Sequence, residues 1–293
     1  MIKSKELNKF NKKALPYYFL TPAMLVLVCL MLYPIIQVII FSFFDNVITN
    51  PNPKFVGLSN YKEVLSDDVF HSSVFHTVHF TVFSVIFHMV IGMSFALLLN
   101  AKINSTVRPL FRLIMILPWL FTPTVIAIVW KLILDPGGIV NFILSRNTEW
   151  FGNPDTSLNA LTFANIWAGY SFYLISILAG LQSVSNDQYD AAKIDGVNGL
   201  QNFWYITLPH LKPVLLSLTM LDLIWTMQVF PLIWILTGGG PGHTTEVMST
   251  YTYKQTFFNF EFSIASTAAV VILVISLVMA FFYARMQNKG DLS

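Results

Sequence analysis

The sequence predicts an all-helical protein that crosses a membrane six times. Of its 293 residues, 55% are hydrophobic and only 11% are charged, whereas soluble domains average about 25% charged residues. Most of the molecular surface must therefore face lipid. Six runs are long and apolar enough to cross the hydrocarbon core, which takes about 20 helical residues. The alternation typical of barrel strands is absent, so each run satisfies its backbone hydrogen bonds as a helix.

The six apolar runs follow one another with hydrophilic segments between them. They cover residues 14–44, 69–101, 113–130, 156–186, 213–235 and 262–284. The fifth run is interrupted once, by Asp222. Pro34, Pro118, Pro123 and Pro231 lie inside these runs, where proline can kink or locally unwind a membrane helix.

The placement of Lys and Arg predicts the orientation, because cytoplasmic loops carry an excess of them. Six spans leave both termini on one side. That side holds twelve of the 17: Lys3, Lys5, Lys9, Lys12, Lys13, Lys102, Arg108, Arg112, Lys193, Lys212, Arg285 and Lys289. The other side holds Lys54, Lys62, Lys131, Arg146 and Lys254. Both termini are therefore predicted to be cytoplasmic, with segments 45–70, 135–157 and 238–261 outside.

The first helix is set apart from the other five by a long segment. Residues 1–70 are expected to hold the cytoplasmic N-terminus, the first span and an extracytoplasmic segment. Residues 71–286 are expected to form a five-helix core with a cytoplasmic loop at 183–212, and 287–293 a cytoplasmic tail. Cys29 is the only cysteine, which excludes an intrachain disulfide. The net charge of +2, with no basic run interleaved with aromatics, argues against a nucleic-acid partner.

The loop between the fourth and fifth runs has strong local signals. Ser185 can cap a first short helix, with Gln188 completing a capping box. Gly196 marks its end, because glycine readily takes the left-handed conformation there. Asn198 can cap a second helix that leads to Pro209. Two interpretations remain open: a structured loop at the lipid interface, or a docking element for a soluble partner.

The same loop resembles the coupling loop of ABC importer permeases. Its stretch Tyr189-Asp-Ala-Ala-x-x-Asp-Gly196, followed by Phe203 and by Ile206-x-Leu-Pro209, is similar to that family's Glu-Ala-Ala, three residues, Gly and a hydrophobic stretch ending in Leu-Pro. One departure is that Asp190 stands where the family usually has Glu, so any ion pair it makes differs in reach. The resemblance implies ATPase-coupling roles for Asp190, Ala191, Ala192, Asp195, Gly196, Leu208 and Pro209.

Two further segments are similar to the carbohydrate-uptake branch of this family. They are Phe55-Val-Gly-Leu-Ser-Asn-Tyr61 and the glycine-rich Leu236-Thr-Gly-Gly-Gly-Pro-Gly242. The resemblance implies the type I ABC importer permease fold in the cell (inner) membrane. It also implies three kinds of protein partner: a second homologous permease, an ABC ATPase dimer and an extracytoplasmic solute-binding protein. The implied solute is a sugar or oligosaccharide, and the first helix would embrace the second permease.

The chain lacks the loop that cradles nucleotide phosphates. No G-x-x-x-x-G-K-[ST] pattern is present, and no Gly-Lys pair occurs anywhere. We therefore expect ATP and Mg to bind the partner ATPase, with no cofactor and no catalytic residue on this chain.

Helix five carries the main candidates for a solute pathway. Asp222 lies mid-span, where a charge costs about 2.5–3.5 kcal/mol and so should face a partner or a cavity. Trp225 and Gln228 follow at three-residue steps and are expected to share its face. An acid, an indole and an amide suit a sugar. In the alternative, Asp222 pairs with a polar group of the second permease and Trp225 simply packs. Tyr170 and Tyr173 are weaker candidates on helix four.

Other functional classes fit less well. Four histidines lie on or near helix two (His71, His76, His79 and His88), but no carboxylate or cysteine joins them in the span, so no metal site is expected. Trp119 and Trp130 are interpreted as interface aromatics. A secondary transporter would need internal repeats and a midplane ion site, and a membrane enzyme several convergent polar groups. A non-sugar solute such as a glycerol phosphate stays an alternative.

Overall fold

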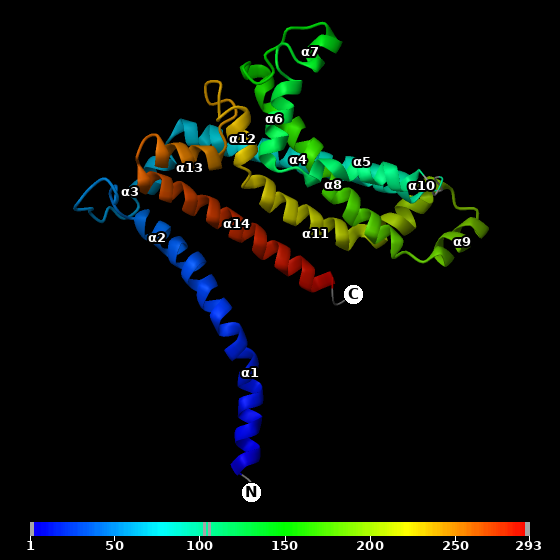
Figure 1. Ribbon diagram of the computed structural model, residues 1–293, viewed down its shortest axis with the longest axis horizontal. Helices are drawn as coiled ribbons and strands as arrows, with labels where there is room; N and C mark the ends of the chain where they lie inside the picture. Colours follow the sequence, from blue (N-terminus) through cyan, green and yellow to red (C-terminus); the bar gives the residue numbers. More distant parts are fainter. Residues whose placement is uncertain (1–2, 102–103, 105–106, 291–293) are drawn as a thin grey trace. The chain divides into compact units, whose positions relative to one another are not determined.

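The computed structural model describes residues 3–101, 104 and 107–290, and in this part of the chain it contains helices but no strand. Figure 1 traces the elements along the chain. Lys102 and the end of the expected cytoplasmic tail, 291–293, lie outside the described residues. By its internal contacts the chain divides into two units, Met1–Val64 with Gln255–Val271, and Leu65–Lys254 with Ile272–Ser293.

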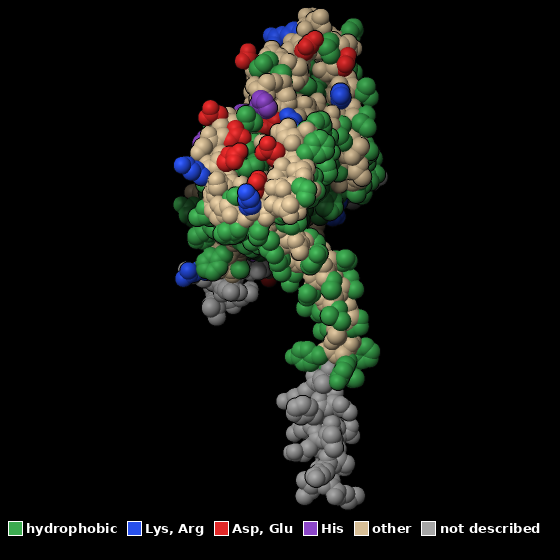
Figure 2. All heavy atoms as spheres, turned by 90° about the vertical axis from the view of Figure 1, so that its left-hand side faces the viewer, with side chains coloured by type: hydrophobic (Ala, Val, Ile, Leu, Met, Phe, Trp, Pro, Cys, Tyr) green, Lys and Arg blue, Asp and Glu red, His purple; other side chains and the backbone are tan. Residues whose placement is uncertain are grey.

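The smaller unit begins with the first expected span. Its helices are α1 (Lys3–Leu27), α2 (Tyr33–Phe41) and α3 (Ser59–Val64), with a π-helical segment η1 (Val28–Leu32) between the first two. The most apolar part of the span Leu15–Phe41 is not buried within the protein, and many hydrophobic side chains lie on the face of this helix that Figure 2 shows. This is the surface expected of a helix that faces lipid or a partner helix.

The segment Phe55–Tyr61, which resembles the carbohydrate branch, hydrogen-bonds to the C-terminal end of α2. The Asn60 amide nitrogen donates to the backbone oxygens of Ser42 and Phe44, both at 2.9 Å. The Ser42 hydroxyl also lies 2.8 Å from the Tyr61 hydroxyl. Because the last carbonyls of a helix have no intrahelical partner, these side chains terminate the span. Gly57 supplies the turn with φ of 60°.

The larger unit is built around two long, closely packed helices, α4 (Asp68–Asn100) and α8 (Pro154–Gln182). Both helices bury small residues: Gly92 on α4, and Ala160 and Ala164 on α8. A Cβ added at Gly92 would lie 2.4 Å from the Cβ of Tyr173. In lipid the hydrophobic effect does not drive helices together, so the close packing that small residues allow is what stabilises this pair.

The other helices of the described residues follow along the chain. They are α5 (Arg108–Leu120), α6 (Pro123–Ile133), α7 (Ile139–Leu144), α9 (Asn186–Ile194), α10 (Gly199–Asn202), α11 (Leu208–Met227), α12 (Pro231–Leu236), α13 (Met248–Phe257) and α14 (Phe262–Gly290), with a second π-helical segment η2 (Phe203–Thr207). Of these, α13 and α14 each belong partly to the smaller unit. One buried cluster joins α8 to α6 and α12, and a second joins it to α4 and α11.

Two of the six expected spans are not single straight helices. The third bends by 101° between Leu120 and Pro123. The fifth ends at Met227 and resumes as α12 at Pro231. Among the described residues, four helices are long and apolar enough to cross a membrane, or five if the bent pair is one span. The all-helical fold is thus confirmed, and the count of six spans stays a prediction.

Candidate functional site

The segment between α8 and α11 has the architecture expected of a coupling element, and we call residues 183–212 the coupling segment. The Ser185 hydroxyl caps α9 by accepting from the Asp187 N–H at 3.2 Å. Of the two caps, the reciprocal capping box forms at Asn198 and Gln201 rather than at Ser185. The second helix was expected to be separate from helix five. Instead, α10 continues through η2 into α11 without a gap.

Gly196 forms the turn that separates α9 from this continuous helix. Its φ is +75°, and its N–H donates to the Lys193 carbonyl at 3.1 Å. The Val197 N–H donates to the Ala192 carbonyl at 2.9 Å. These two bonds make a Schellman motif, which holds the residue after the helix end in the left-handed region. The direction of α9 relative to α11 is therefore set by backbone geometry at one glycine.

The other residues with implied coupling roles fall into buried and exposed sets. Ala192 is buried, Leu208 is half-buried, and Ala191, Asp195 and Pro209 are exposed. The Asp190 carboxylate pairs with Lys193 at 2.6 Å, with both side chains 66% exposed, and exposed pairs of this kind contribute little to stability. The Asp190 ion pair thus lies on the surface of the coupling segment.

The coupling segment presents apolar side chains to its surroundings. The large ones are Ile194, Leu200, Trp204 and Tyr205, each more than half exposed. Leu200 also lines a cavity of about 430 Å³ at the ends of α4 and α8, together with Tyr189 and Phe203. The Tyr189 hydroxyl lies 3.1 Å from that of Thr207, which ties α9 to η2. Several large exposed apolar side chains on one short segment are typical of an interaction site.

The expected pathway residues on helix five do not share one face. Asp222 is 6% exposed, whereas Trp225 is 55% exposed. Gln228 lies past the last turn of α11, where its exposed amide donates to Ser276 at 3.2 Å. Asp222 pairs within the chain, with Nδ1 of His88 at 2.8 Å. Within α11, Asp222 and Trp225 already differ in exposure, and the helix ends at Met227, so the second step of three residues, to Gln228, leaves the helix.

Trp225 belongs to a row of aromatic rings on three helices. Its ring centroid lies 5.5 Å from that of Phe172 on α8. Phe172 in turn stacks on Trp119 of α5 at 6.2 Å. Trp119 and Trp225 are 50% and 55% exposed. Tyr170 and Tyr173 are buried behind this row. The sequence suggested an interface role for Trp119, and it could not reveal the stacking across helices.

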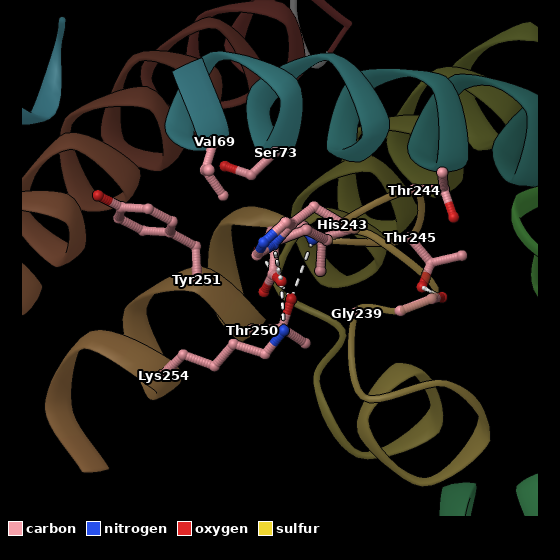
Figure 3. Close-up of polar contacts among 12 residues, drawn as sticks. Val69, Ser73, Gly239, His243, Thr244, Thr245, Thr250, Tyr251 and Lys254 are labelled. Carbon is pink, nitrogen blue, oxygen red and sulfur yellow. Dashed lines mark hydrogen bonds and ion pairs between the residues drawn. The ribbon is translucent and has the colours of Figure 1, made fainter. Parts of the chain in front are cut away.

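A buried carboxylate on the loop after helix five was missed by sequence reasoning. The Glu246 side chain is fully buried, and its Oε2 accepts from Lys254 and lies 3.1 Å from Nδ1 of His243. His76 on α4 donates to the Glu246 backbone oxygen at 3.1 Å. Figure 3 shows Lys254 reaching from α13 toward His243 and the loop that carries Gly239. A signal was present, because Lys254 is the only Lys or Arg in the loop 238–261.

The Glu246 carboxylate leaves no room for a side chain at Gly239. Its φ is +87°, and an added Cβ would lie 2.6 Å from Oε2 of Glu246. The Thr245 hydroxyl lies 2.7 Å from the Gly240 carbonyl. The glycine-rich segment thus packs against a buried carboxylate that pairs with the partly exposed Lys254. Across the described residues, no group of three or more His, Cys, Asp or Glu is placed to hold a metal ion.

The fold and the coupling segment define a membrane-embedded transport subunit. Residues 88–289 match the family described as the inner membrane component of binding-protein-dependent transport systems. The chain belongs to this family of ABC importer permeases.

Curated relatives match along almost the full chain. The trehalose/maltose transport system permease protein of Thermococcus litoralis is 35% identical over 93% of this chain and 92% of its own length. The sn-glycerol-3-phosphate transport system permease protein of Agrobacterium fabrum is 29% identical over 96% and 97%. Among solved structures, a bacterial ABC transporter involved in import of the acidic polysaccharide alginate has a TM-score of 0.84 at 24% identity, covering 97% of this chain and 99% of that one. That likeness shows the type I ABC importer permease fold.

Proposed function

We propose that this chain is the permease subunit of an ATP-driven, binding-protein-dependent importer of a sugar or oligosaccharide. It forms half of a translocation pathway with a second homologous permease. An ABC ATPase dimer binds ATP and Mg, and an extracytoplasmic binding protein delivers the solute. Both termini and the coupling segment face the cytoplasm. The relative named for trehalose and maltose transport supports the solute class.

The coupling segment carries this proposal. Its exposed apolar side chains offer a surface to a soluble partner, and η2 joins them to α11 without a break. A push on α9 is therefore transmitted through the Gly196 turn into helices that lie in the membrane. This is a two-state element biased by a partner, because nucleotide binding to the ATPase favours one position of the segment.

The aromatic row supports a carbohydrate solute. Sugar rings present apolar C–H faces to aromatic rings and hydroxyl groups to amides, so Trp225, Phe172 and the Gln228 amide offer both kinds of contact. In this proposal Trp225 and Gln228 line the pathway. The other three candidates, Asp222, Tyr170 and Tyr173, are buried, and in this proposal they support the pathway wall without lining it. The domain boundaries given above remain part of the proposal.

The test is reconstitution of the chain with its second permease, ATPase and binding protein in proteoliposomes. Uptake of a radiolabelled disaccharide such as maltose or trehalose should require both ATP and the binding protein. Trp225→Ala and Gln228→Leu should each raise the solute concentration for half-maximal uptake, while Trp234→Phe, whose ring packs on Phe230 and Tyr253, should not. Uptake unchanged in both variants would remove these residues from the pathway.

A glycerol phosphate is the second candidate solute, favoured by the Agrobacterium fabrum relative. A phosphate dianion requires Arg, Lys or N–H donors along its route. The exposed stretch around Trp225 and Phe172 is aromatic instead. Competition of labelled glycerol phosphate against maltose in the same proteoliposomes decides between them.

A further inference from the structure

The imidazole of His88 joins three helices in the interior of the larger unit. Its Nδ1 lies 2.8 Å from Oδ2 of Asp222 on α11, and its Nε2 lies 3.0 Å from the backbone oxygen of Asn165 on α8. His88 is 2% exposed and Asp222 6%. We propose that this pair is a clamp that makes α8 and α11 move as one body during transport. His88 and Asp222 are then positioning residues.

The hydrogen bonds of the clamp determine how many protons His88 and Asp222 carry between them. A carbonyl oxygen only accepts, so Nε2 of His88 must carry a proton. The contact between Nδ1 and Oδ2 needs one more proton, held by the imidazole or by the carboxyl group, because two bare acceptors would repel at 2.8 Å. Either arrangement gives the pair no net charge. Oδ1 of Asp222 accepts from the Thr226 hydroxyl at 2.9 Å. A neutral, fully bonded pair is the form in which ionisable groups persist inside a span.

The backbone of α8 leaves just enough room for the His88 ring. A Cβ added at Gly169 would lie 2.2 Å from both Cε1 and Nε2 of the ring. Glycine is therefore required here for close approach, since Gly169 has no left-handed φ. Sliding α8 along α4 by one turn, about 5.4 Å, would bring a side chain onto the ring. The clamp thus fixes the register of α8 as well as its distance from α4.

The clamped helices are the two that the coupling segment connects. α8 ends at Gln182, immediately before the segment, and α11 begins at Leu208. His88 holds a carbonyl of the first and a carboxylate of the second. If the segment moved α8 and α11 separately, at least one of these buried bonds would break. The inference rests on the proposed transport function, because that function supplies the force on the segment.

The experiment removes the clamp with and without leaving a buried charge. Asp222→Asn should transport near the wild-type rate, because an asparagine amide can donate to Nδ1 of a neutral imidazole while its oxygen still accepts from Thr226. His88→Leu alone should lower the amount of inserted protein, since it strands the carboxylate. The double variant His88→Leu/Asp222→Leu should restore that amount, because apolar replacement of a buried pair is often neutral for stability.

Uptake per ATP hydrolysed separates positioning from mere stability. In the double variant this ratio should stay lower by about tenfold at wild-type abundance, within the usual range of coupling between sites. Ser73→Ala is the matched control, a buried group on the same helix whose hydroxyl bonds the Phe70 carbonyl one turn away. A double variant with wild-type uptake per ATP, or an Asp222→Asn variant as impaired as the double variant, would overturn the clamp.

A second measurement needs neither solute nor partner. Spin labels at the exposed positions Ala179 on α8 and Leu216 on α11, in a Cys29→Ser background, report the distance between these helices in the purified chain. The distance distribution should be narrow with the clamp and clearly broader in the double variant. Equal widths would refute the clamp. Absent wild-type uptake of any tested solute would instead count against the proposed function and leave this result standing.

Discussion

Replacing Gly196 tests whether the coupling segment works as a rigid lever. Gly196 has φ of +75°, and apart from its neighbours along the chain nothing lies within 4 Å of the position a Cβ would take. Alanine would therefore meet no steric clash and would add only the cost of a left-handed residue, about 1–2 kcal/mol. That cost corresponds to roughly a 5–30-fold loss in the population of the observed turn.

Proline at the same position should be more severe. Its ring fixes φ near −65°, which is incompatible with the observed turn, and it removes the N–H that donates to the Lys193 carbonyl. The segment is exposed, so the chain should still insert. We expect Gly196→Pro to uncouple ATP hydrolysis from uptake and Gly196→Ala to lower uptake per ATP partially.

The assay measures binding-protein-stimulated ATP hydrolysis and solute uptake in the same proteoliposomes. Gly199→Ala is the control, because that glycine also has open space around it but lacks a left-handed φ. It should behave as the wild type. Normal uptake by a fully inserted Gly196→Pro complex would refute the lever, because the direction of α9 could then change without consequence.

Three further predictions concern the loops outside the long helices. Gly239→Ala should lower the melting temperature of the complex by several degrees, since the new methyl group would press on the Glu246 carboxylate; Gly242→Ala, at positive φ but in open space, should lower it less. Lys254→Met should destabilise the loop by about 3 kcal/mol, at the low end for a broken buried pair, because buried Glu246 would keep its contact with His243 but lose the lysine; hydrogen exchange measures this, and Lys254→Arg should recover most of it. Asn141→Ala should expose the loop after α6 to proteolysis, because the Asn141 side chain makes four hydrogen bonds there; equal cleavage rates would contradict this.

The sequence was sufficient wherever structure depends on neighbours along the chain. Apolar runs predicted the helical fold, Ser185 and Asn198 cap the helices expected of them, and Gly196 ends α9. Each of these features is decided by residues within about one helical turn. The buried pairs are different. His88 and Asp222 are 134 positions apart, and a histidine in a span has too many possible partners for local pattern to choose one.

The effect of a proline in this chain also depends on structure that the proline alone does not predict. Both π-helical segments end two residues before a proline, η1 at Leu32 before Pro34 and η2 at Thr207 before Pro209. Proline lacks an N–H, and its ring clashes with the carbonyl four residues earlier. A π-helical turn widens the backbone ahead of the proline and relieves that clash, so each helix continues through it. The residue before each proline accordingly keeps helical angles, with φ, ψ of −60°, −50° at Tyr33 and −65°, −43° at Leu208.

Pro123 has the opposite outcome because of its neighbour Thr122. Thr122 is extended, with φ, ψ of −68° and 153°, and its hydroxyl accepts from the Val125 N–H at 3.4 Å. A capping side chain before a proline at the first helical position makes a new helix start favourable. The chain therefore breaks and turns by 101° instead of widening. Pro22 and Pro213 lie inside α1 and α11 with neither a π-helical turn nor a break, so the residues around each proline decide between continuation and a bend. That decision brings α5, and with it Trp119, against α8 in the aromatic row.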